Sequence, residues 1–220
     1  MQKIPTLFKK KFDENNKYLG VIPEWNVELD PNKLYAVTIK WDGTACAIID
    51  GELYKRYDVK PGKKIPDGAI MCQPYDKDAK HNPCWVKCDR DNSDDKWHWA
   101  AFDKGRAYDK PVSSKTYPLN DGTYELIGKH IQNNPYYIDD EILIPHGNFI
   151  ITSLNPLIID VKQTYTEFAI ILGTFAELEG VVIWSTHNNC LIPTINLDDL
   201  TLDKPVAKLR RKDFGYKWNE

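Results

Sequence analysis

The sequence has no long apolar run and no leader of the kind that exports a chain. None of its hydrophobic stretches approaches the roughly 20 residues that a membrane-spanning helix needs. The N-terminus, MQKIPTLFKKKF, carries charges where a signal peptide would have its apolar segment. These absences predict an intracellular, cytoplasmic protein that does not enter a membrane.

The cysteines show no CxxC spacing, and their number is odd. They are Cys46, Cys72, Cys84, Cys88 and Cys190. Without a secretory signal, such a set predicts reduced thiols inside a cell. His81, Cys84 and Cys88 lie close together in the chain, but no second ligand pair follows at a usual zinc-site distance. We therefore expect ordinary thiols here rather than a metal cluster.

An excess of one charge sign is also missing. The 29 Lys and Arg residues oppose 32 Asp and Glu residues, which gives a net charge of −3 and excludes a chain-wide positive coat. The bases gather instead in three stretches, residues 9–11, 55–64 and 204–217. These clusters favour contact with a phosphate backbone along a groove, although basic runs near a terminus are often only solvated.

The length fits one domain. The chain has 220 residues, of which 42% are hydrophobic, and it contains no internal repeat, so we expect a single domain over residues 1–220. Residues 1–20 are Lys-rich and are predicted to form an N-terminal arm. Residues 76–104 balance their charges and contain large aromatic side chains, which predicts an ordered surface excursion. The possible anchors of the arm are Ile4, Leu7 and Phe8.

Residue patterning predicts mainly strands. Asp42-Gly43 and Asp50-Gly51 separate three extended runs within residues 34–58, and Asp-Gly is a strong signal for a tight hairpin turn. This segment therefore predicts a three-stranded antiparallel meander. Apolar spacings of three and four predict a helix over residues 163–178. Further strands are expected at residues 122–131, near 142–152, at 181–184 and in a segment ending at 214. The mixed order predicts an α+β fold of antiparallel sheets flanked by helices.

The meander brings Lys40 into a possible anion site. If both turns are tight, Lys40 pairs with Ala45, and Ala45 pairs with Arg56, so that two cations flank a small side chain on one face. A lysine at such a strand end can act as a nucleophile when burial or nearby cations favour its neutral amine. A surface lysine before a turn is the alternative interpretation.

Four charged residues in later strands add to this pattern. Glu125 lies in an apolar strand, and Glu179 begins another strand. Lys208 and Arg210 share one face of a strand because side chains alternate with period two. Each residue alone could lie at a strand edge or on a solvated stripe. Together with Lys40, they predict a site for an α-phosphate and a divalent metal.

In this order, the motifs resemble those of the covalent lysine nucleotidyltransferase superfamily, which contains ATP-dependent ligases and capping enzymes. Lys40-Trp41-Asp42-Gly43 matches the KxDG motif I, Lys55-Arg56 matches motif Ia, YELIG resembles motif III and EGVVI matches motif IV. Lys208-Leu209-Arg210 lies where motif V usually has two lysines, and its arginine keeps the charge but changes the geometry. The resemblance spans residues 35–212 and is greatest to small single-domain ATP-dependent 5′-to-3′ RNA ligases.

The resemblance implies a fold and a reaction. The fold would be an adenylation domain, and the reaction would join a 5′-phosphate to a 3′-hydroxyl of RNA through a lysyl-AMP intermediate and an adenylylated RNA end. ATP and Mg²⁺ (or Mn²⁺) would be required, and a monomer is expected. Phe149 is a candidate for the aromatic ring of motif IIIa that stacks on the base, with a core position as the alternative.

The resemblance also implies a role for each matched residue. Lys40 would be the nucleophile, and Glu179 would hold the metal. Asp42 would orient the lysine or hold the water shell of the metal. Glu125 would accept hydrogen bonds from the ribose hydroxyls. Three further cations, Arg56, Lys208 and Arg210, would bind phosphate.

Three alternatives stay open. A DNA ligase and a GTP-dependent mRNA-capping guanylyltransferase belong to the same superfamily, but both normally carry an OB-fold after motif V. The sequence ends eight residues after Lys212, so we expect no OB-fold here. The third alternative is a nucleic-acid-binding protein that kept the fold without catalysis.

Overall fold

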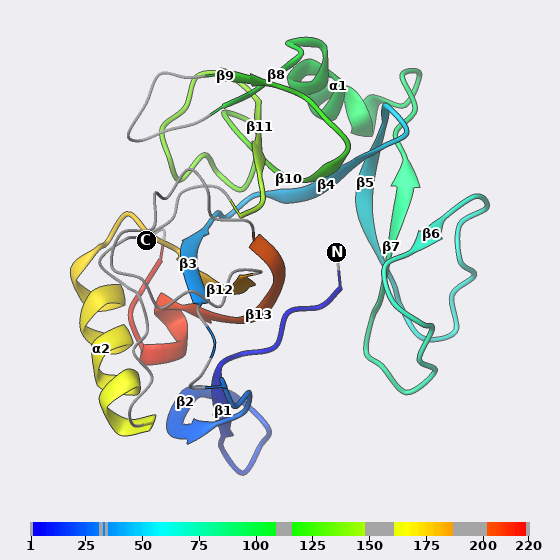
Figure 1. Ribbon diagram of the computed structural model, residues 1–220. Helices are drawn as coiled ribbons and strands as arrows, with labels where there is room; N and C mark the ends of the chain where they lie inside the picture. The colour runs from blue at the N-terminus through cyan, green and yellow to red at the C-terminus, as the bar shows by residue number, and fades with distance from the viewer. Residues whose placement is uncertain are drawn as a thin grey trace. The chain divides into compact units, whose positions relative to one another are not determined.

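The computed structural model describes residues 2–30, 33, 35–108, 116–147, 161–186 and 202–218. The chain divides into two compact units. Unit 1 comprises Met1–Lys3 and Asp42–Asn148, and unit 2 comprises Ile4–Trp41 and Phe149–Glu220. Both contain mostly antiparallel strands with few helices, so the expected α+β class is confirmed (Figure 1).

Unit 2 is built on a three-stranded sheet in the order β13-β12-β3. The central strand, β12 (Gly180–Thr186), pairs antiparallel with β3 (Tyr35–Lys40) and with β13 (Leu202–Arg210). Side chains along each strand point alternately to the two faces of the sheet. One face is apolar along its length, whereas the other combines a small buried cluster of Ala36, Val182 and Trp184 with charged side chains.

One face of this sheet forms the core of unit 2. Its apolar side chains pack with Phe168 and Leu172 of α2 (Val161–Thr174), and Leu172 has no exposed surface. The contact buries the apolar stripe of the helix, which the sequence predicted over residues 163–178. The helix itself begins at Val161 and ends at Thr174, and Phe175 beyond its end is 43% exposed. The sheet residues of this core are Val37, Val181, Ile183, Ala207 and Leu209.

The N-terminal segment belongs to this core and is not a separate arm. It forms the antiparallel strands β1 (Phe8–Phe12) and β2 (Tyr18–Trp25), and Leu7 and Phe8 are fully buried. Just before β1, the N–H of Leu7 donates to the carbonyl of Lys208 at 3.1 Å. The expected anchoring by Leu7 and Phe8 is therefore confirmed, whereas the expected arm is replaced by a paired hairpin.

Arg211 fixes the end of α2 within unit 2. It begins η3 (Arg211–Phe214), and its guanidinium donates to the carbonyls of Leu172 and Phe175. The last carbonyls of a helix have no partner inside the helix, so a buried cation there satisfies them. The N–H of Arg211 also donates to the carbonyl of Glu179 at 2.9 Å, which ties the start of β12 to the end of β13.

Unit 1 contains an eight-stranded sheet in the order β6-β7-β5-β4-β10-β11-β8-β9. Neighbouring strands are antiparallel except for β11 and β8. The helical segments are η1 (Ser93–Asp95) and α1 (Lys96–Asp103). The strands are β4 (Thr44–Ile49), β5 (Glu52–Val59), β6 (Ile70–Met71), β7 (Asn82–Lys87), β8 (Arg106–Tyr108), β9 (Thr116–Pro118), β10 (Gly122–Ile127) and β11 (Ile142–Pro145).

The predicted meander is correct at its second turn and wrong at its first. Asp50 and Gly51 have φ values of 52° and 76°, and they join β4 to β5 as a tight hairpin turn requires. Neither Asp42 nor Gly43 has a positive φ, so the chain does not reverse there. Instead β3 pairs with β12, and β4 pairs with β10.

The proposed row of Lys40, Ala45 and Arg56 is therefore wrong at Lys40, which pairs with Gly180 of β12 and not with Ala45. Ala45 pairs with Glu125 of β10, whereas β4 and β5 have the register that the second turn predicted, with Cys46 opposite Lys55. The Asp-Gly signal failed because Gly43 serves close packing. A Cβ atom on it would come within 2.3 Å of the Leu126 carbonyl oxygen on β10.

Other expected segments are placed as follows. Residues 76–104 form β7, η1 and α1, but they are not the surface excursion that the sequence predicted. β7 pairs with β5 inside the sheet, and Cys84, Trp85 and Ala101 are buried. The strand expected near 142–152 is β11, which ends at Pro145. Phe149 and Cys190 lie outside the described residues. No helix in the described parts of the chain is both long enough and apolar enough to span a bilayer.

The burial of α2 yields a stability prediction. Leu172→Ala removes a fully buried side chain and leaves a cavity, so we expect the free energy of unfolding to fall by about 2–5 kcal/mol. Ile170→Ala on the same helix is the control, because Ile170 is 60% exposed and its loss should change stability by only about 0.5 kcal/mol. Urea denaturation followed by circular dichroism measures both. Equal losses would contradict the assigned face of α2.

Candidate functional site

The second face of the unit 2 sheet carries three cations in register. Lys40 and Arg210 both pair with Gly180, one from each side, and Val182 pairs with Lys208 in the next row. Directly paired residues share a face, and residues two apart on a strand share it too. The register therefore gathers Lys40, Lys208 and Arg210 on the face opposite the core.

Gly180 makes this close arrangement possible. A Cβ atom on it would lie 2.2 Å from the Leu209 carbonyl oxygen and 2.8 Å from the Cα of Arg210. Both contacts are with backbone atoms, which cannot move aside without breaking the β12–β13 ladder. Glycine is therefore required between Glu179 and the rest of β12, which gives a physical reason for the Glu-Gly pair.

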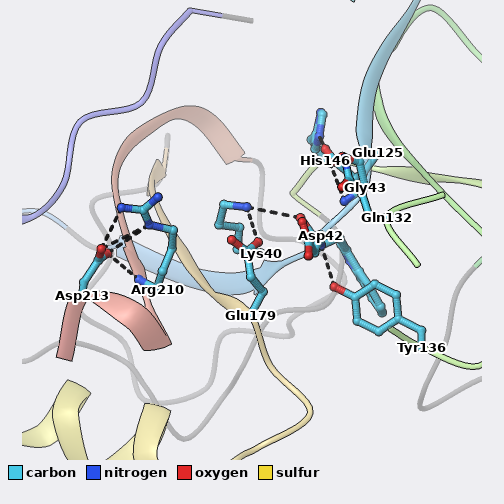
Figure 2. A network of polar contacts seen from close by, with 11 residues as sticks. Lys40, Asp42, Gly43, Glu125, Gln132, Tyr136, His146, Glu179, Arg210 and Asp213 are labelled. Atoms are coloured by element: carbon cyan, nitrogen blue, oxygen red, sulfur yellow. Dashed lines mark hydrogen bonds and ion pairs between the residues drawn. The ribbon is translucent and has the colours of Figure 1, made fainter. Parts of the chain in front are cut away.

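Lys40 and Glu179 form an ion pair on this face. Figure 2 shows the Lys40 amine directed at the Glu179 carboxylate, and the same Nζ donates to the Trp41 carbonyl at 3.3 Å. The side chains are only 23% and 12% exposed. Partial burial strengthens the attraction, and it also makes either group costly to leave unpaired.

Arg210 is held by Asp213, which has no exposed side-chain surface. The guanidinium Nη2 donates to Oδ1 of Asp213 at 2.7 Å, and the backbone N–H of Arg210 donates to Oδ2 at 2.8 Å. Tyr18 donates to Oδ1 as well, at 2.7 Å. Burial disfavours the charged guanidinium, but the hydrogen bonds and charge of Asp213 outweigh it and raise the pKa of Arg210.

Lys208 differs from the other two cations in its ionisation. Burial, followed by the charges of Lys40 and Arg210, lowers the pKa of Lys208 to about 8. The register explains this, because Lys208 lies one row from both cations on the same face. The face therefore holds an excess of positive charge that an anion can relieve.

Unit 1 contains a separate polar group around Glu125. Its Oε1 accepts the N–H of Gly43 at 3.1 Å, and its Oε2 lies 2.8 Å from Nε2 of His146. Both side chains are 13% exposed. Each carboxylate oxygen has a second lone pair, so Glu125 can still accept hydrogen bonds from a ligand.

Asp42 and Gly43 are fixed by neighbours in unit 1. The N–H of Asp42 donates to the Tyr136 hydroxyl oxygen at 2.6 Å, and Nε2 of Gln132 lies 3.5 Å from the Gly43 carbonyl. Figure 2 shows these partners together with Glu125. Asp42 and Gly43 are therefore held in place by the side chains of Tyr136 and Gln132, and also by β4, which begins at the next residue.

The structure assigns the expected site residues to two sets. Unit 2 brings together Lys40, Glu179, Lys208 and Arg210. Unit 1 contains Asp42, Arg56 and Glu125, and Arg56 there contacts Asp58 at 3.1 Å.

Sequence reasoning missed three residues that hold members of these two sets in place. They are Asp213, His146 and Tyr136. Only Asp213 had a usable signal, because an acid three residues after an arginine fits the tight turn that follows β13. Folding alone brings His146 to Glu125 and Tyr136 to Asp42.

Several bases in two of the three basic stretches already contact groups within the protein. In residues 204–217, Arg211 is buried as a helix cap and Arg210 is paired with Asp213. In residues 55–64, Lys55 contacts the buried Asp95 at 2.5 Å. The charge available for a nucleic-acid backbone is therefore smaller than the sequence predicted.

Glu179 has the ligand chemistry that a divalent cation needs. Its carboxylate is a hard oxygen donor, the ligand type that Mg²⁺ prefers, and it already holds a cation in the form of Lys40. The backbone N–H of Asp42, as given above, donates to the Tyr136 hydroxyl oxygen.

Neither a protein-family model nor a curated protein matches this sequence.

The lowered pKa of Lys208 predicts a pH-dependent stability. The unfolded chain keeps a lysine pKa near 10.4, so between about pH 8 and 10.4 it binds more protons than the folded protein, and stability should rise with pH. We expect the free energy of unfolding of the wild type, relative to Lys208→Met, to increase by about 3 kcal/mol across this range. Urea denaturation at several pH values measures it. A difference that stays constant with pH would contradict the assigned burial of Lys208.

Proposed function

We propose that this protein is an ATP-dependent RNA ligase that acts through a covalent lysyl-AMP. The observation that carries the proposal is the Lys40–Glu179 ion pair on a sheet face that also holds Lys208 and Arg210. A nucleophilic amine, a carboxylate and two cations are the groups that attack on a nucleotide α-phosphate requires. The KxDG and EGVVI patterns that contain Lys40 and Glu179 support it further.

The first reaction is a displacement at phosphorus. The neutral amine of Lys40 forms an N–P bond to the α-phosphorus of ATP, the bond to the bridging oxygen breaks, and pyrophosphate leaves. The amine loses one proton as the phosphoramidate forms. Lys208 and Arg210 neutralise the charge on the α-phosphate oxygens, which is the main catalytic requirement in such a reaction.

Glu179 has two roles in this proposal. In the free protein it pairs with Lys40 and holds the amine at the face that carries the other cations. A Mg²⁺ ion held by Glu179 would supply charge neutralisation to the departing pyrophosphate. A carboxylate that turns to a metal also gives up its contact with Lys40, which frees the amine for attack.

The unit 1 residues take the roles that their chemistry allows. Glu125, fixed by Gly43 and His146, has acceptor capacity left for the ribose hydroxyls. Arg56 supplies a cation for a phosphate in exchange for its contact with Asp58. Asp42 has its position fixed by Tyr136.

The later steps reuse the same phosphate-binding groups. The 5′-phosphate oxygen of an RNA strand attacks the phosphoramidate, which releases Lys40 and yields an adenylylated end. A 3′-hydroxyl then attacks that end, and AMP leaves. Lys40 therefore forms covalent bonds in the first two steps only.

Covalent labelling tests the first step. We expect incubation with α-³²P-ATP and Mg²⁺ to give a labelled protein band on a denaturing gel, and Lys40→Ala to abolish it because the variant lacks the amine that pairs with Glu179 and attacks the α-phosphorus. Lys204→Ala is the matched control, since Lys204 is an exposed lysine of β13 and should keep the label. Label from GTP alone would indicate a capping enzyme, and no label from either nucleotide would refute the covalent mechanism.

Strand sealing tests the substrate. We expect the wild type to join 5′-phosphorylated RNA to a 3′-hydroxyl end, and Lys40→Ala to fail with ATP but to seal RNA whose 5′ end is already adenylylated, because the last step does not use the amine. Denaturing electrophoresis of labelled strands measures both. Preferential sealing of DNA would favour the DNA-ligase alternative. Failure of the wild type to seal either adenylylated RNA or adenylylated DNA would favour a non-catalytic binder.

A further inference from the structure

A second cluster of reactive side chains lies in unit 1, apart from every residue that the proposed reaction uses. Cys88 follows β7 directly, Asp95 closes η1, and His98 lies in the first turn of α1. Their ligating atoms, one from each side chain, all lie within 4.8 Å of one another. All three residues are buried, with exposed fractions of 3%, 1% and 8%.

His98 is the member that ordinary packing does not explain. Neither Nδ1 nor Nε2 has a hydrogen-bond partner among the described residues, although the side chain is more than nine-tenths buried. A neutral imidazole contains one donor and one acceptor, and buried polar groups of this kind are nearly always paired.

Asp95 and Cys88 complete a mixed donor set. Oδ1 of Asp95 contacts Lys55 at 2.5 Å, and Oδ2 accepts the N–H of Asp89 at 3.0 Å, which fixes the carboxylate while each oxygen keeps a lone pair. The Cys88 backbone is fixed by its N–H bond to the Leu53 carbonyl at 2.9 Å. Its thiol is close to the other two ligands and can lose its proton to a metal.

We propose that Cys88, Asp95 and His98 form a binding site for a divalent transition metal, with Zn²⁺ as its occupant. A thiolate, an imidazole and a carboxylate together suit zinc, whereas Mg²⁺ and Ca²⁺ prefer oxygen ligands alone. Tetrahedral zinc at about 2.0–2.3 Å from each ligand holds the ligands roughly 3.5 Å apart. The ligand atoms now lie within 4.8 Å of one another, so binding requires them to approach by at most about 1.3 Å.

Zinc at this position has a structural consequence within unit 1. The three ligands come from the end of β7 and from both helical segments, η1 and α1. A single ion would fasten this segment, and it would share the Asp95 carboxylate with Lys55 of β5. Binding replaces the Cys88 proton, so one proton is released for each metal ion and affinity should fall as the pH is lowered.

Cobalt substitution tests the site directly. Full-length protein is stripped with a chelator and titrated with Co²⁺. We expect about one equivalent to bind, with thiolate-to-cobalt charge-transfer absorption in the near ultraviolet, and Zn²⁺ to abolish the signal by displacement. Cys88→Ser should remove the absorption, and His98→Gln should weaken binding by about tenfold or more. Cys84→Ser is the matched control, because Cys84 is a fully buried thiol outside the cluster and should leave the titration unchanged.

A measurement on the wild type keeps the proposal testable if a variant fails to fold. Removing the metal should lower the melting temperature, and Zn²⁺ but not Mg²⁺ should restore it. Absence of cobalt absorption in the wild type, a melting temperature insensitive to Zn²⁺, or an unchanged signal in Cys88→Ser would overturn the proposal. None of these outcomes depends on whether Lys40 is labelled by a nucleotide, so the two proposals fail independently.

Discussion

The pairing of β12 with a strand on each side is the constraint on which unit 2 depends. The absent side chain of Gly180 lets β13 pack against the backbone of β12, and the resulting register determines which residues share a face. One face then takes Val181 and Ile183 into the core, and the other carries Lys40 and Arg210. The same ladder therefore provides both the hydrophobic core and the charged surface of the candidate site.

The charges on that surface are balanced by specific carboxylates. Glu179 pairs with Lys40, and Asp213 pairs with Arg210, whereas Lys208 is left with a lowered pKa among cations. A face that is preorganised in this way gains most from a ligand that brings its own negative charge, which is the physical basis of the proposed nucleotide chemistry. The buried group formed by Cys88, Asp95 and His98 differs from that surface. Its imidazole has no hydrogen-bond partner among the described residues, and its three side chains suit a metal ion rather than an anion.

Local patterns predicted the elements better than their partners. The spacing of apolar residues placed α2 within a few residues, and Asp50-Gly51 formed the turn that its sequence indicated. Asp42-Gly43 carries the same dipeptide, yet it begins a segment of unit 1 without forming a hairpin, because Gly43 packs against β10. The prediction that Lys40 pairs with Ala45 failed for this reason, since a dipeptide states only that a turn is favourable and not which strand lies beside it.

The sequence by itself determined the α+β class, the α2 helix and the identity of the charged residues, because each follows from alternation, spacing or residue type over a few positions. Tertiary structure alone decided that Lys40 meets Glu179 and that Arg211 caps a helix instead of facing solvent. Lys40 and Glu179 are 139 positions apart. Contacts over such distances depend on strand register and burial, which no local pattern encodes.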